Sequence, residues 1–107
     1  MYEDGQGVRR NYVEAARWYN FAANSGDAFA QYYLGAQYLD GRKATPRNYV
    51  LAHMWSNLSA ANADGISLSY TRADAIKTRE IAAKRMKPNQ IAEAQVLALA
   101  WKPTPKF

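Results

Sequence analysis

A single histidine is the side chain best suited to acid–base or metal chemistry in this chain of 107 residues. His53 has no paired carboxylate or nucleophile near it in sequence, and both proton transfer and metal binding need several such groups together. The chain has no cysteine, which excludes disulfides, thiolate catalysis and cysteine metal sites. The sequence therefore predicts a structural role for His53, no cofactor or metal site, and a protein that is not an enzyme.

Basic residues form a second group of candidates. The net charge is +5, which favours acidic partners. We expect five basic residues in loops at one edge of the molecule, here called the basic edge: Arg9, Arg10, Arg42, Lys43 and Arg47. Lys84, Arg85 and Lys87 form a further cluster. Such an edge could hold an acidic peptide, a phosphate backbone or an anionic glycan, but solvated loop charge is the simpler interpretation because no aromatic residues are interleaved for stacking.

The elements that position these residues are repeated. Two segments recur at offsets of 36 and 37 residues: Tyr2-Glu-Asp-Gly5 as Tyr38-Leu-Asp-Gly41, and Asn11-Tyr-Val13 as Asn48-Tyr-Val50. Trp18 and Trp55 match at the second offset. A period between about 20 and 50 residues is typical of stacked repeats, whose units bury their apolar faces against each other. We therefore expect Trp18 and Trp55 to lie in equivalent surroundings.

Apolar periodicity and end signals predict five helices and no strand. The expected ranges are about 12–25, 28–40, 49–62, 71–86 and 89–101. Expected end residues are Asn11, Asp27, Asn48 and Thr71 before four of the helices, Gly41 after the second, and Pro88 as the first residue of the last. The second helix is apolar nearly all round, which indicates packing on several sides or a face shown to a partner.

The second helix and its flanks carry a family pattern. Gly26-Asp-Ala-x-Ala30-Gln31-x-x-Leu34-Gly35-x-x-Tyr38-x-x-Gly41, with Trp18-Tyr19 and Ala22-Ala23 before it, resembles the Sel-one-like repeat family, a relative of the tetratricopeptide repeat. Residues 74–95 are similar to the tail of many bacterial arrays of this family, although Lys87 stands where a Ser or Thr cap is usual. The resemblance implies an all-α solenoid, a right-handed superhelix of antiparallel helix pairs used as a protein adaptor. Relatives act at bacterial envelopes, in host interaction and in eukaryotic protein quality control.

The second helix also carries the preferred binding surface. If Ala30, Leu34 and Tyr38 pack against a partner helix, four residues point away from it: Phe29, Tyr32, Ala36 and Leu39. Resemblance to tetratricopeptide-like arrays implies that this side, here called the groove face, is the concave groove. Tyr and Phe anchors in grooves are common in peptide recognition. The alternative is that neighbouring helices cover these rings completely.

Aromatic residues on the first helix suggest a further contact. Trp18, Tyr19 and Phe21 lie on a helix whose partner in the repeat would precede residue 1. Because exposed aromatic area of this kind tends to be covered, we expect pairing with a second copy or an upstream segment. A truncated first unit also leaves any targeting segment outside the sequence, so cytoplasmic, periplasmic and secreted locations in a bacterium all stay open.

The predicted organisation is one repeat domain over residues 1–107. Its parts are a partial repeat at 1–26, a second repeat at 27–65 and a C-terminal helical cap at 66–107. No apolar run approaches the roughly 20 residues that span a bilayer. The predicted function is a non-enzymatic scaffold or adaptor that binds a peptide or protein segment in the groove. The alternative is electrostatic binding of nucleic acid or another anionic polymer through the basic edge.

Overall fold

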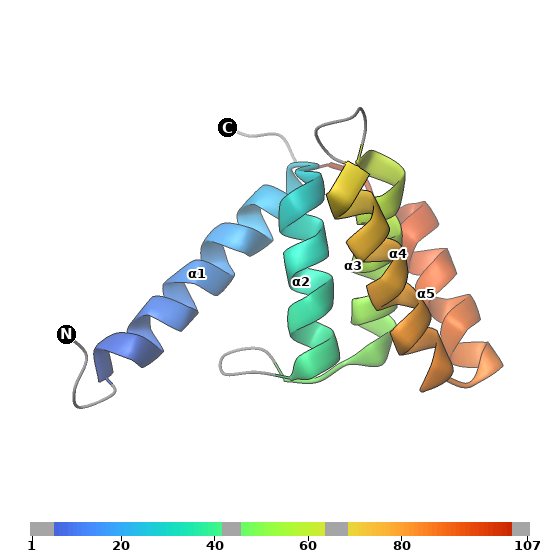
Figure 1. Ribbon diagram of the computed structural model, residues 1–107, viewed down its shortest axis with the longest axis horizontal. Coiled ribbons are helices and arrows are strands. Elements are labelled where there is room, and N and C mark those ends of the chain that lie inside the picture. Colours follow the sequence, from blue (N-terminus) through green and yellow to red (C-terminus); the bar gives the residue numbers. More distant parts are fainter. Residues whose placement is uncertain (1–5, 42–45, 64–68, 104–107) are drawn as a thin grey trace.

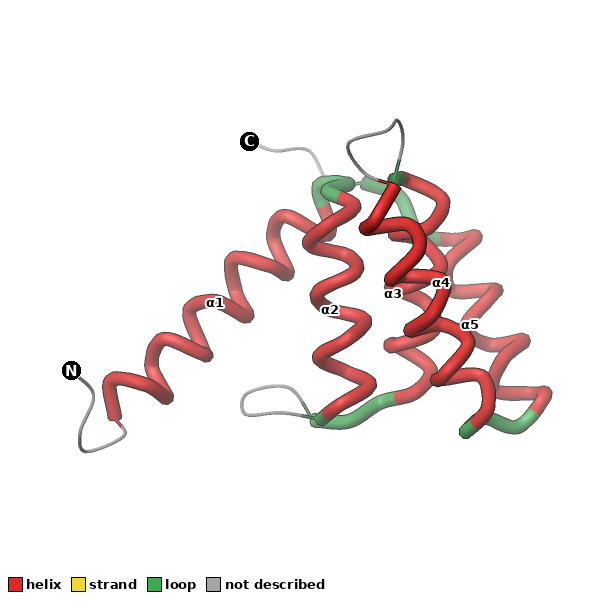
Figure 2. The backbone as a smooth tube through the Cα atoms, viewed as in Figure 1, coloured by secondary structure: helices red, strands yellow, loops and turns green. Residues whose placement is uncertain are grey.

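The fold is an array of helices that run alternately up and down (Figure 1). The computed structural model describes residues 6–41, 46–63 and 69–103, with only the backbone described for residues 6–13 and 69. Within these residues the elements are α1 (Gln6–Asn24), α2 (Ala28–Asp40), α3 (Tyr49–Asn62), α4 (Ser69–Lys84) and α5 (Pro88–Ala100), and none is a strand. α3 is central and packs against α2, α4 and α5, whereas α1 leads away from α2 toward its own N-terminal end (Figure 2). The prediction of an all-α fold with five helices is confirmed.

Local side-chain chemistry sets the ends of α2 and α3. The Asp27 carboxylate accepts a hydrogen bond from the Ala30 N–H at 2.8 Å, and the Asn48 side chain accepts one from the Leu51 N–H at 3.0 Å. Gly41 ends α2 with φ of 67°, a left-handed conformation that glycine adopts without steric cost. These caps were predicted from the sequence, and both helices have the predicted bounds. Each N-cap contributes about 1 kcal/mol to helix stability.

Two predicted helix starts are wrong. Asn11 and Thr71 lie inside α1 and α4, which begin earlier, so neither residue is a cap. A helix passes through an Asn or Thr at a cost below about 1 kcal/mol. α4 contains no glycine or proline, and the one glycine of α1, Gly7, lies near its start. As a consequence Arg9 and Arg10, expected in a loop, are part of α1. Pro88 is the first residue of α5, as predicted.

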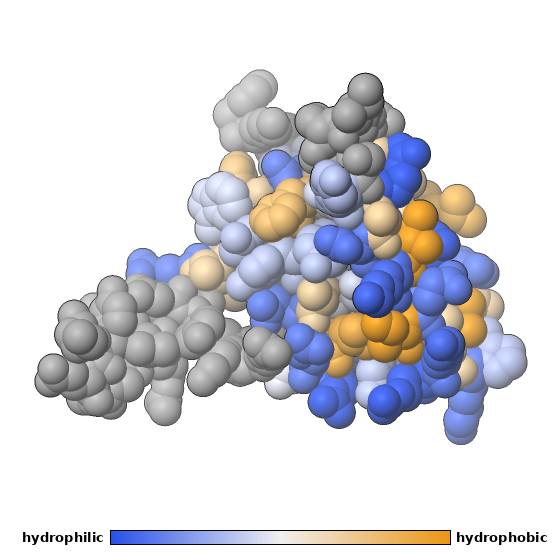
Figure 3. All heavy atoms as spheres, viewed as in Figure 1, coloured by the Kyte–Doolittle hydropathy of each residue, from blue (hydrophilic) through white to orange (hydrophobic). Residues whose placement is uncertain are grey.

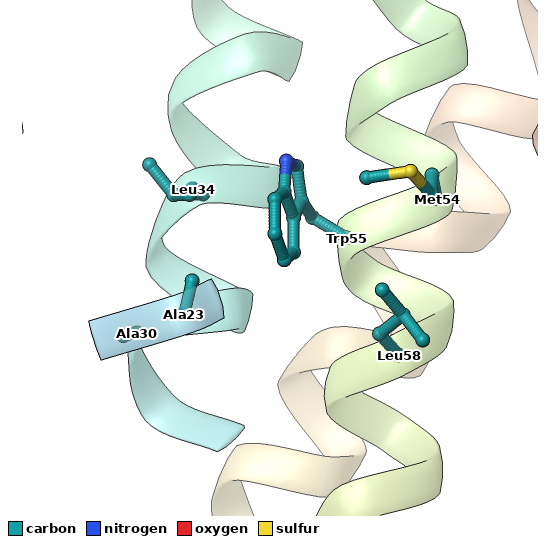
Figure 4. Packing of buried hydrophobic residues seen from close by; sticks show 6 residues of the cluster. All are labelled: Ala23, Ala30, Leu34, Met54, Trp55 and Leu58. Atoms are coloured by element: carbon teal, nitrogen blue, oxygen red, sulfur yellow. The ribbon is translucent and has the colours of Figure 1, made fainter. Parts of the chain in front are cut away.

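A core of apolar side chains joins α1, α2 and α3. Its buried members are Ala23, Ala30, Leu34, Met54, Trp55 and Leu58 (Figure 4). The Trp55 indole projects from α3 toward α2 and Leu34, and Trp101 at the end of α5 meets it edge-on with ring centroids 6.4 Å apart. Full burial of a large apolar side chain contributes about 1.5–3 kcal/mol, so this cluster carries much of the stability.

Buried polar side chains tie the helix ends into this core. Gln31 donates through Nε2 to the Ala23 carbonyl at 3.0 Å, and the Ser59 hydroxyl donates to the Ala28 carbonyl at 2.7 Å. The Ala23 carbonyl lies in the last turn of α1, where carbonyls lack partners within their own helix. The hydrogen bond from Gln31 links the end of α1 to α2, and it explains why this polar side chain is fully buried.

The two repeat-related tryptophans do not lie in equivalent surroundings, so that expectation is wrong. Trp55 is 6% exposed, whereas Trp18 is 61% exposed. α3 is packed by three other helices, while α1 packs mainly against α2. The sequence repeat reproduces the order of helices, but the burial of each position depends on how many neighbours its helix has.

Candidate binding groove

The groove face occupies one side of α2. Its four residues, Phe29, Tyr32, Ala36 and Leu39, follow the three- and four-residue spacing that places side chains on one helix face. An adjoining side of α2 meets α1, where Tyr33 stacks on Tyr19 with ring centroids 3.8 Å apart. A third side meets α3, where a Cβ on Gly35 would stand 2.4 Å from the Ser56 Oγ atom. The groove face thus lies between the contacts of α2 with its neighbours.

The aromatic residues of the groove face are accessible. Phe29 is 48% exposed, and Tyr32, Ala36 and Leu39 are half-buried. The rings of Phe29 and Tyr32 are neighbours, with centroids 6.0 Å apart and planes tilted by 55°. Neighbouring helices of the described chain therefore do not cover the Phe29 ring, and a ligand could contact both rings together.

The structure describes the basic edge only in part. Arg47 lies in the segment before α3 and donates through Nη2 to the Asp40 carbonyl at 3.3 Å. Arg9 and Arg10 lie in the N-terminal half of α1, which diverges from the end of α2 (Figure 1). Arg42 and Lys43 fall outside the described residues. Among the described residues the structure therefore keeps Arg47 apart from the pair on α1.

A cavity of about 420 Å³ lies where the groove face reaches Arg47, and we call it the end pocket. Its lining combines the end of α2, the start of α3 and the end of α4: Leu39, Asp40, Arg47, Tyr49, Ile81 and Arg85. On the face shown in Figure 3, hydrophobic side chains lie as separate patches between hydrophilic ones. Sequence reasoning had noted Leu39, Arg47 and Arg85 for separate reasons and missed Tyr49 and Ile81. No signal in the sequence joins them, because they meet only through helix packing.

The family comparison identifies the kind of repeat. The family model described as Sel1 repeat matches residues 1–27 and 28–64, which together are more than half of the chain. The chain belongs to the Sel1 repeat family. Comparison with curated proteins and with solved structures gave no match.

Membership of the Sel1 repeat family bounds the function. Sel1 repeats form helical solenoids and are generally protein–protein interaction modules, typically non-catalytic scaffolds. The second Sel1 match spans α2 and α3, the pair that carries the groove face and the core. In the described part of the chain, no three His, Cys, Asp or Glu side chains gather as a metal site. None of the described helices has both the length and the apolarity to cross a membrane.

His53 is buried inside this Sel1 repeat, at 5% exposure. Its Nδ1 atom and the Ser56 Oγ atom have no hydrogen-bond partner among the described residues. Burial lowers the pKa of His53 below its ordinary value, the positive charge of Arg79 lowers this pKa further, and Glu80 opposes the shift. The folded protein therefore favours the neutral imidazole.

We expect the protein to lose stability as the pH falls below neutrality. The unfolded chain takes up a proton at His53 near pH 6.5, whereas the folded chain resists this proton, so the unfolded state binds more protons in that window. The contribution is fully present above the unfolded pKa and is lost as the pH falls toward the lower, folded pKa. Urea unfolding at about pH 7.5 and about pH 5.5 measures the loss, because this range brackets the ordinary histidine pKa.

The control is His53→Gln, which keeps a polar side chain but cannot titrate. Because the chain has one histidine, the variant should show a clearly smaller loss between the two pH values. Equal losses in both proteins would contradict the assignment to His53.

Proposed function

We propose that the chain is a non-enzymatic scaffold that binds a peptide or protein segment along the groove face. Support comes above all from Phe29, which is 48% exposed beside Tyr32 on a helix whose other sides are packed. Aromatic residues in accessible, well-supported positions dominate the energy of many interfaces. The proposal agrees with the general role of Sel1 repeats in protein–protein interaction.

The rigidity of α2 also supports this proposal. Asp27 caps the helix, Gln31 ties it to α1, and the Ser59 hydroxyl ties its first turn to α3. A surface that is ordered before binding loses little conformational entropy on binding, so modest contacts suffice for measurable affinity. Ala36 adds a small side chain one turn after Tyr32, which leaves room for a side chain of the ligand.

The double variant Phe29→Ala and Tyr32→Ala tests this function. Because a single anchor residue contributes about 2 kcal/mol or more and the effects of neighbouring anchors do not add fully, we expect the double change to weaken binding by at least about 30-fold. Peptides selected from a random dodecapeptide library on the unaltered protein, then labelled with fluorescein, give the affinity by anisotropy. Tyr70→Ala on α4 is the matched control, since Tyr70 is an aromatic residue that is 82% exposed on another helix. Unchanged affinity in the double variant, with unchanged circular dichroism, would remove the proposal.

Electrostatic binding of nucleic acid or another anionic polymer is the alternative, and it has less support. Arg9 and Arg10 lie on the diverging half of α1, away from Arg47. Salt distinguishes the two functions, because the slope of log K against log salt is about −0.9 for each phosphate contacted on duplex DNA. Peptide binding on aromatic rings is expected to persist at moderate ionic strength.

We also propose that the aromatic face of α1 is covered in solution by a second copy of the chain. Trp18 is 61% exposed and Phe21 is 57% exposed, and the Trp18 ring lies edge-on to Tyr19 at 5.0 Å. In a longer chain an upstream segment is the other candidate. Light scattering over a range of concentrations should show a dimer that Phe21→Lys abolishes. A monomer at every concentration would contradict pairing between copies.

A further inference from the structure

The end pocket brings two positive side chains to an apolar surface. Arg47 and Arg85 both line it, and neither forms an ion pair with an acidic side chain among the described residues. Leu39 and Ile81 supply apolar lining, and Ile81 is 40% exposed. Asp40 is the one acidic residue of the lining. The pocket therefore offers two guanidinium groups beside apolar surface.

The position of Arg47 is fixed by the backbone around it. The Asn48 N–H donates to the Tyr38 carbonyl at 2.9 Å, which folds the segment before α3 back onto the end of α2. Gly41 permits this fold, because a Cβ on it would stand 2.7 Å from the Cβ of Arg47. The Arg47 guanidinium in turn donates to the Asp40 carbonyl at 3.3 Å. Arg47 is thus held at the pocket before any ligand arrives.

The start of α3 also favours an anion at the pocket. Tyr49, which lines the pocket, is the first residue of α3, and the N-terminus of a helix carries partial positive charge. Arg85 follows directly after α4, and its N–H donates to the Ala82 carbonyl at 2.9 Å, so its backbone continues the helix end. Positive charge thus reaches the pocket from the start of α3 and from the Arg85 side chain, while the C-terminal ends of α2 and α4 carry partial negative charge.

The groove face leads into the end pocket, because Leu39 belongs to both. Phe29 and Leu39 are ten positions apart on α2. At a helical rise of 1.5 Å per residue, this separation is roughly 15 Å. An extended peptide advances about 3.3 Å per residue, so about four or five residues cover the same length.

From this arrangement we infer that the end pocket binds an acidic side chain, Asp or Glu, of the peptide that occupies the groove face. This acidic residue lies about four or five positions from an apolar residue of the same peptide that contacts Phe29 and Tyr32. Its carboxylate accepts hydrogen bonds from Arg85 and Arg47, while adjoining aliphatic atoms contact Leu39 and Ile81. The inference rests on the proposed peptide-binding function and names the chemistry of its ligand.

The test uses a random dodecapeptide library displayed on phage and selected on the full chain. Enriched sequences should carry Asp or Glu at the stated spacing from an aromatic or aliphatic residue. For a labelled peptide from this set, changing the acidic residue to its amide should weaken binding by about tenfold or more, because a hydrogen bond to a charged group is lost. Arg85→Glu in the protein should weaken the same peptide equally, and a Lys at the acidic position should restore binding to Arg85→Glu.

The matched control is Arg17→Glu, which makes the same charge change at an exposed position of α1 and should leave affinity unchanged. Peptides that bind equally well to Arg85→Glu but lose binding with Phe29→Ala and Tyr32→Ala would overturn the acidic-ligand inference alone. Failure to enrich any peptide would overturn both this inference and the proposed groove.

Discussion

Replacing Trp55 by Ala is expected to lower the free energy of unfolding by about 3–5 kcal/mol, the range for truncating a large buried aromatic side chain. The same change at Trp18 is expected to cost less than about 1 kcal/mol, because an exposed side chain leaves no cavity. The two positions match in the sequence repeat, but Trp55 is 6% exposed and Trp18 is 61% exposed. Trp55 loses contacts with Leu34 and Trp101, whereas Trp18 lies in the open face of α1.

Urea unfolding followed by far-ultraviolet circular dichroism measures both changes. Small domains are stable by about 5–15 kcal/mol, so Trp55→Ala removes a large fraction of the total. Trp55→Phe is the control, because it keeps an aromatic ring in the core and should recover part of the loss. Similar losses at Trp18 and Trp55 would contradict the difference in packing. If the stability lost in Trp18→Ala depends on protein concentration, the loss comes from the pairing between copies.

The helix ends that could be predicted are those set by local chemistry. Asp27, Asn48 and Gly41 each act on backbone groups within four residues, so their effect is visible in the sequence. Asn11 and Thr71 have the same residue types, yet the helix continues through them. A cap is a preference of about 1 kcal/mol, and both helices continue through these positions in spite of it.

The proposed binding surface was predictable in part. Helical spacing places Phe29 and Tyr32 together, and the structure gives their rings as neighbours. The end pocket was not predictable, because Leu39, Tyr49 and Ile81 come from three helices and meet only after packing. The prediction of equivalent surroundings for Trp18 and Trp55 was wrong for the same reason, because the burial of each tryptophan depends on how many helices surround it. Sequence periodicity fixes which face a residue occupies, while tertiary packing decides what that face meets.

Gly35→Ala is expected to destabilise the fold by about 1–3 kcal/mol, the usual cost of overpacking a tight interface. A Cβ at this position would stand 2.4 Å from the Ser56 Oγ atom and 3.2 Å from the Ala52 carbonyl oxygen. Alanine favours a helix over glycine by about 1 kcal/mol, so a measured loss would show that the contact outweighs this gain. Thermal and urea unfolding measure the change, and a stabilised variant would contradict the close approach of α2 and α3.

Ser56 allows the cause of that loss to be separated. Its hydroxyl is fully buried without a hydrogen-bond partner among the described residues, so Ser56→Ala alone should be neutral or stabilising. In the Ser56→Ala background the closest clash is removed, and Gly35→Ala should cost less, with a coupling energy of about 0.5–3 kcal/mol. Backbone atoms at 3.2 Å remain, so part of the cost should persist. If the effects of Gly35→Ala and Ser56→Ala on stability are additive, the Ser56 hydroxyl moves aside freely. The backbone alone then sets the distance between α2 and α3, the two helices that carry the groove face and the core.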